Sequence, residues 1–107
     1  MALMDKERAA RLLEKWISFY GMNDASAWEP VDYAYVHKGC EAMRYAIETL
    51  RGQVANETIS SQEAVRRLEE WPTMHIMDDP TVWEAEDFPF VRNAFEAVHF
   101  AVTTLKT

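Results

Sequence analysis

The chain has 107 residues, of which 49% are hydrophobic, a length that predicts a single domain over residues 1–107. A count of 18 Asp or Glu against 11 Lys or Arg gives a net charge of −7, which disfavours direct binding to nucleic acid because phosphate backbones demand a Lys and Arg surface. The single cysteine, and the lack of an apolar run of about 18 residues, predict a cytoplasmic protein with neither an internal disulfide nor a membrane-spanning helix.

The sequence repeats itself at a constant offset of 55 residues. Residues 5–52 align with residues 60–107 without a gap, and 16 of the 48 pairs are identical, where chance would give roughly three. The match is plainest between WEPVDYAYV, which begins at Trp28, and WEAEDFPFV, which begins at Trp83. We therefore expect a tandem duplication, with internal repeats 5–52 and 60–107.

The first arm of each copy has the apolar spacing of an amphipathic helix. In the first copy Asp5 is placed to cap the helix, and apolar residues then recur every three or four positions: Ala9, Leu12, Leu13, Trp16, Ile17 and Tyr20. The second copy keeps Ala64, Val65, Leu68 and Trp71 but has Pro72 in place of Ile17. We expect that helix to end or kink about a turn early.

A short turn and a second helix follow in each copy. Asp24 and Asp79 are placed to cap the turns that carry Trp28 and Trp83, and Asp32 and Asp87 are placed to cap the second helices. Apolar residues spaced four, three, four and three then mark the seam of a bundle: Val36, Cys40, Met43, Ile47 and Leu50, and in the second copy Val91, Phe95, Val98, Val102 and Leu105.

One helical hairpin cannot bury its apolar stripe, so two hairpins should pack face to face. We predict an all-α four-helix bundle made of two tandemly duplicated helical hairpins with pseudo-two-fold symmetry. Its core should contain Leu13, Trp16, Met43, Ile47, Leu68, Trp71, Val98 and Val102.

Candidate catalytic and metal-binding residues are few. Glu96 and His99 have the Glu-x-x-His spacing with which bundles hold two metal ions, but such a site needs the motif on two helices, and the equivalent of His99 is Arg44. A solvated ion-pair stripe fits these residues better. Cys40 lies on the predicted seam, which indicates a small buried hydrophobe and not a catalytic thiol. We expect no metal, no cofactor and no enzyme activity.

The acidity is concentrated in the second copy. Residues 1–55 hold seven Lys or Arg and eight Asp or Glu, whereas residues 56–107 hold four and ten. No basic residue lies between Arg67 and Arg92. We predict a partner-binding face made of Asp78, Asp79, Glu84, Glu86, Asp87, Glu69 and Glu70.

Such a face fits a basic protein partner, because complementary charge raises the encounter rate and selects the partner. A nucleic-acid-binding protein, such as a nuclease or a host-defence complex, has a basic groove that these carboxylates would block. The favoured function is therefore a small acidic interaction or inhibitor protein. Two alternatives stay open: the carboxylates only keep the domain in solution, or the paired tryptophans line a pocket for a flat or cationic ligand in a regulatory module.

Overall fold

The structure, a computed structural model, describes residues 4–53, 59–75, 77 and 79–106. Over these residues the chain forms four α-helices, two 3₁₀ turns and no strand. The elements in chain order are α1 (Lys6–Phe19), η1 (Ala25–Ala27), α2 (Pro30–Leu50), α3 (Ser61–His75), η2 (Pro80–Val82) and α4 (Phe88–Lys106). The prediction of an all-helical chain with four principal helices is confirmed for the described part of the chain.

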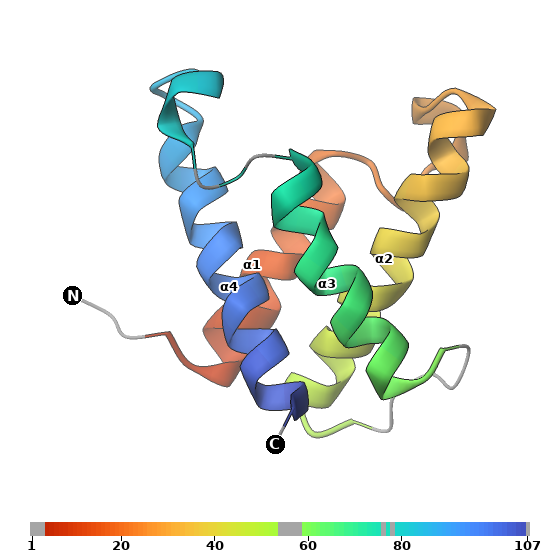
Figure 1. Cartoon of the computed structure of the whole chain (residues 1–107), viewed down its shortest axis with the longest axis vertical. Coiled ribbons are helices and arrows are strands. Elements are labelled where there is room, and N and C mark those ends of the chain that lie inside the picture. The colour runs from red at the N-terminus through yellow and green to blue at the C-terminus, as the bar shows by residue number, and fades with distance from the viewer. Residues whose placement is uncertain (1–3, 54–58, 76, 78, 107) are drawn as a thin grey trace.

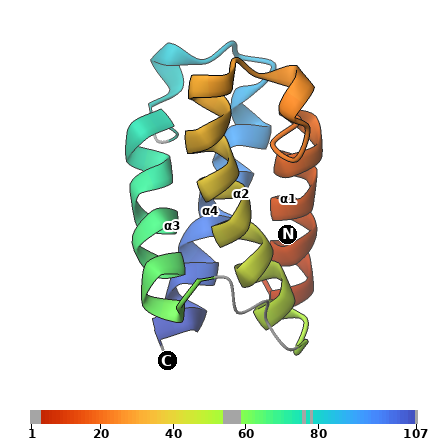
Figure 2. The same ribbon diagram turned by 90° about the vertical axis from the view of Figure 1, so that its right-hand side faces the viewer.

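The four helices run up and down in turn (Figures 1 and 2). Helix α1 packs against α2 and α4, and α3 packs against the same two helices from the other side. The last turns of α1 and α3 and the first turns of α2 and α4 therefore lie at one end of the molecule, together with η1 and η2 (Figure 1). We call this end, made of residues 19–35 and the described residues of 77–90, the connection end.

Aspartate caps begin three of the six elements. The backbone N–H of Arg8 donates to Asp5 Oδ1 (2.7 Å), as expected for the cap of α1. Asp24 accepts from the Ser26 N–H (3.0 Å) at η1, and Asp79 accepts from the Thr81 N–H (2.9 Å) at η2. These three predicted caps are confirmed, and the turns that they begin end at Trp28 and Trp83, as the sequence predicts.

The cap predicted at Asp32 is wrong. Helix α2 begins two residues earlier, at Pro30, and the residue at its N-cap position is Glu29, whose side chain makes no capping bond. Proline suits the first helical position because its φ is already helical and its missing N–H would have no partner there. Asp32 lies in the first turn, where its negative charge interacts favourably with the helix dipole and stabilises the helix. Asp87 directly precedes α4, as predicted, and its carbonyl accepts from the Val91 N–H (3.1 Å).

Of the early end and the kink expected at Pro72 in α3, the early end is wrong. The helix continues through Pro72 to His75. Proline removes one backbone hydrogen bond to the residue four positions earlier, but here only three helical residues follow it, and the ring is buried. Its burial among apolar side chains helps to offset that loss.

All eight residues predicted to form the core are buried. Two aromatic stacks join the halves: Trp16 lies on Phe90 with ring centroids 5.7 Å apart, and Trp71 lies on Tyr35 at 5.5 Å. Each stack links the first helix of one half to the second helix of the other. The packing between the halves is therefore aromatic near the connection end.

Candidate functional site

The predicted acidic residues divide into two groups in space. Glu69 and Glu70 lie on the exposed side of α3, six and five residues before its last residue, and both are in ion pairs. Lys106 Nζ lies 3.0 Å from Glu69 Oε2, and an Arg66 nitrogen lies 2.8 Å from Glu70 Oε1. Their charges are already partly neutralised within the chain.

The remaining predicted carboxylates belong to the connection between α3 and α4. Glu84, Glu86 and Asp87 are exposed, whereas Asp78 lies outside the described residues. Asp79 has a local task, because its carboxylate accepts from both the N–H and the hydroxyl of Thr81 (2.9 and 2.6 Å). These hydrogen bonds lower the pKa of Asp79 and keep it charged as a cap.

The other connection brings further carboxylates to the same end. Asp24, Glu29 and Asp32 are all exposed there. Comparing the net charge of the two halves did not indicate this contribution, because both connections lie at the same end of the bundle, on opposite sides of it (Figure 1). The sequence has no Lys or Arg in residues 16–37 or 68–91, so the connection end is acidic on both of its sides.

Exposed apolar side chains gather at this end as well. Four large hydrophobic residues of the described chain are exposed: Phe19 at 68%, Val31 at 80%, Tyr35 at 39% and Val82 at 54%. Phe19 ends α1, Val31 and Tyr35 lie in the first two turns of α2, and Val82 lies in η2. Sequence periodicity could have indicated Val31, since it falls outside the predicted seam, but not that the four residues share one end.

Three carboxylates of the connection end have no structural task that the described residues reveal. Glu29, Glu84 and Glu86 are exposed and form no ion pair or side-chain cap with any described residue. Asp87 acts differently, because its charge adds to burial in raising the pKa of Tyr20. The three glutamates are therefore the side chains best placed to meet an external cation.

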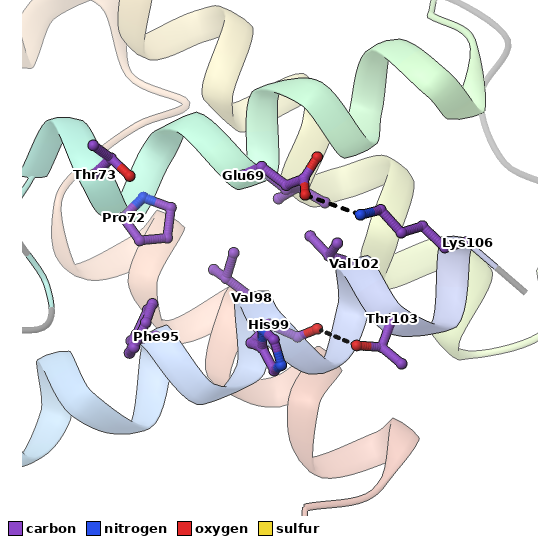
Figure 3. Close-up of a pocket in the computed structure, with 10 residues that line it drawn as sticks. Glu69, Pro72, Thr73, Phe95, Val98, His99, Val102, Thr103 and Lys106 are labelled. Atoms are coloured by element: carbon purple, nitrogen blue, oxygen red, sulfur yellow. Dashed lines mark hydrogen bonds and ion pairs between the residues drawn. The ribbon is translucent and has the colours of Figure 1, made fainter.

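A second candidate site is a groove between α3 and α4 (Figure 3). Its volume is about 330 Å³, and Leu68, Pro72, Phe95, Val98 and Val102 give it an apolar lining. The pair of Glu69 and Lys106 lies at one end, and His99 lies at the mouth. The position of His99 beside this groove was not predicted from the sequence. A related groove of about 420 Å³ lies between α1 and α2, where Arg51 binds Glu14 (2.7 Å) as Lys106 binds Glu69.

The Glu-x-x-His pattern of Glu96 and His99 lies on the surface, where the predicted stripe of ion pairs would place it. Glu96 and His99 are both exposed, and Arg92 lies 3.6 Å from Glu96. Over the part of the chain that the structure describes, no three His, Cys, Asp or Glu side chains gather as metal ligands would. In the same residues no helix is both long and apolar enough to cross a bilayer.

Cys40 is buried on the seam of α2, as predicted. Burial raises the pKa of its thiol, although the Arg44 side chain acts in the opposite direction. Because the thiolate is the nucleophilic form, a raised pKa makes this sulfur less reactive at neutral pH.

The four tryptophans lie in packed or hydrogen-bonded positions. Trp16 and Trp71 are buried in the core, and Trp28 donates its indole N–H to the carbonyl of Gly21 (2.9 Å). None of the residues that line the α3–α4 groove is a tryptophan. Trp71 instead lines a smaller pocket of about 220 Å³ between α2 and α3, together with Tyr35 and Arg67. The ligand pocket at the tryptophan pairs therefore stays a prediction.

Comparison with known proteins found no relative of this chain. No protein-family model matches the chain, and no significant similarity was found to a curated protein or to a solved structure.

Proposed function

We propose that this chain is a small cytoplasmic interaction or inhibitor protein that binds a basic protein partner through its connection end. The observation that carries the proposal is the coincidence of two features at that end. Each connection carries exposed carboxylates together with exposed apolar side chains, and no Lys or Arg lies among them in the sequence.

This combination matches the usual anatomy of a protein interface. Apolar and aromatic side chains supply most of the binding free energy at the centre, and charged groups at the rim raise the association rate and select the partner. Phe19 and Val31 are the most exposed apolar residues and are the candidate anchors. The partner surface should carry Lys or Arg around an apolar depression, as the nucleic-acid-binding groove of a nuclease or host-defence complex would.

The proposal includes a tandem duplication as the origin of the scaffold. Three features support it: the order helix, 3₁₀ turn, helix occurs twice, an aspartate caps both turns in the same way, and the pair of Glu14 and Arg51 has its counterpart in Glu69 and Lys106. A second half with the same apolar faces supplies the packing surface that a single hairpin lacks.

The test is capture of a partner from the native host with the wild-type chain and with two matched variants. The first variant carries Glu29→Gln, Glu84→Gln and Glu86→Gln at the connection end. The second carries Glu7→Gln, Glu69→Gln and Glu96→Gln, which removes the same charge from exposed positions outside that end. All six side chains are exposed, so both variants should fold with little change in stability.

We expect the first variant to associate more slowly with the captured protein and to show a weaker dependence on salt, while the second behaves as wild type. Val31→Ser and Val82→Ser should speed dissociation without changing the salt dependence. Equal losses from both glutamate variants would show that only total charge matters. No loss from either would leave the carboxylates as a solvated surface and contradict the proposal.

A further inference from the structure

Positive charge gathers on one face of α1 although the chain as a whole is acidic. An open hollow of about 680 Å³ lies beside α1 and reaches Asn93 of α4. Its lining includes Arg8, Arg11, Leu12 and Lys15. These four residues, spaced at i, i+3, i+4 and i+7, lie in one row along the helix, and we call them the basic stripe.

Two cations of the basic stripe, Arg11 and Lys15, are not neutralised by a described neighbour, because neither forms an ion pair with one. Glu14 borders the hollow but accepts two hydrogen bonds from Arg51 (2.8 and 2.7 Å), which lower the pKa of Glu14 and hold its carboxylate toward α2.

The corresponding face of α3 is neutralised by its own side chains. There Glu63 and Glu70 stand where α1 has Arg8 and Lys15, and Arg66 forms ion pairs with both. All four cations of residues 56–107 are in ion pairs: Arg66, Arg67, Arg92 and Lys106. Unneutralised positive charge is therefore found in the first half, and the basic stripe is where it meets a hollow.

We infer that the basic stripe binds the connection end of a second copy of this chain, around Val82, Glu84 and Glu86. The two surfaces complement each other in charge, and each has an apolar member, Leu12 on the stripe and Val82 beside the glutamates. Nucleic acid fits the stripe less well than a second copy does. Its phosphates would meet only about three cations on a chain whose net charge is −7.

The contact joins two different surfaces, so it is heterologous, and a pair joined in this way still has one free basic stripe and one free connection end. Association should therefore proceed beyond a dimer as concentration rises and should weaken with salt. The inference rests on the same connection end as the proposed function. A second copy and a basic partner would compete for it, which makes self-association a means of holding the chain inactive until its partner is present.

The test is sedimentation of the purified chain at low and high salt, with two charge-reversal variants. One variant carries Arg11→Glu and Lys15→Glu on the basic stripe, and the other carries Glu84→Lys and Glu86→Lys. All four side chains are exposed, and circular dichroism melts will show whether each variant keeps the fold. Wild type should associate at low salt, and each variant alone should associate roughly tenfold or more weakly. An equimolar mixture of the two variants should recover association, since each supplies the surface that the other has lost.

Three results would overturn the inference. Wild-type chain that stays monomeric at the highest attainable concentration and low salt would exclude the contact. Folded variants that associate alone as wild type does, or that fail to associate when mixed, would show that other surfaces are used. Binding of an oligonucleotide by monomeric wild type, lost with Arg11→Glu and Lys15→Glu, would assign the stripe to nucleic acid. Salt-sensitive capture of a partner by a strictly monomeric chain would leave the proposed function standing and remove only the self-association.

Discussion

A methyl group added at Gly39 would collide with the indole of Trp71. An ideal Cβ at Gly39 lies 2.3 Å from Trp71 Cζ3 and 2.7 Å from Cε3, whereas carbon atoms in contact lie about 3.5 to 4.0 Å apart. The indole would have to retreat by roughly 1 Å or more to restore such a distance. It has little room to do so, because it is 5% exposed and stacked on Tyr35 with the rings 7° from parallel.

Two effects of opposite sign then decide the stability of Gly39→Ala. Alanine in a helix interior is favoured over glycine by about 1 kcal/mol, but overpacking a close-packed core costs about 1 to 3 kcal/mol. With an overlap against a ring that cannot turn away, the upper half of that range applies. We expect a net loss of about 1 to 2 kcal/mol in the free energy of unfolding, with a fall in Tm of roughly 4 to 8 °C for each kcal/mol lost.

The assay is urea unfolding followed by circular dichroism, in the wild-type background and in Trp71→Phe. The smaller ring of phenylalanine leaves room for the methyl group, so Gly39→Ala should become neutral or stabilising by up to about 1 kcal/mol in that background. If Gly39→Ala changed the free energy of unfolding equally in both backgrounds, the collision with Trp71 would be excluded as the cause. Ala94, the residue equivalent to Gly39 on α4, already carries a methyl group in a fully packed position, so the constraint belongs to the site around Trp71.

Further predictions concern stability and pH. Trp16→Ala should lower the free energy of unfolding by about 3 to 5 kcal/mol, measured by urea unfolding, because it removes a buried, stacked indole. Hydrogen bonds from Arg66 and Arg67 lower the pKa of Glu63 to about 2, so its contribution to stability should be complete above pH 4.5 and be lost as the pH falls toward 2. Thermal melts of wild type and Glu63→Gln across that range should converge at the acidic end. Cys40→Ser should cost about 1 to 2 kcal/mol, since it buries a hydroxyl on an apolar seam, and wild-type Cys40 should react with a thiol reagent only as fast as the chain opens.

The helices and the core could be predicted because apolar spacing follows directly from helix geometry. Every buried position on the seam of α2, from Val36 to Leu50, recurs at the three-and-four spacing of one helix face. Helix ends were less predictable, because competing signals lie within a few residues of each other. At α2 the proline at position 30 started the helix before the aspartate at position 32 could cap it. At α3 the burial of Pro72 outweighed its tendency to end a helix.

The candidate surface could be predicted only in part, since charge in the sequence does not show which charges meet. Arg51 binds Glu7 and Glu14, 44 and 37 residues away, and these pairs neutralise carboxylates of the first half. Lys106 does the same for Glu69, which the sequence had assigned to the partner-binding face. The net charge of each half therefore does not show which carboxylates stay unpaired: among the described residues these include Glu29 in the first half and Glu84 and Glu86 in the second.

The repeated segments WEPVD (residues 28–32) and WEAED (residues 83–87) contain both residues that stabilise the fold and residues that are exposed to solvent. The tryptophans close the 3₁₀ turns, and the aspartates lie at the beginnings of α2 and α4, where a negative charge stabilises the helix. Glu29 and Glu84 occupy the same position in the two segments, yet both side chains are exposed and neither forms an ion pair with a described residue. No side-chain contact with a described residue accounts for these two glutamates, although the charge of Glu29 lies at the start of α2 and favours that helix. The proposed function would explain why both connections carry them, since an exposed carboxylate beside Val31 or Val82 is available to a basic partner.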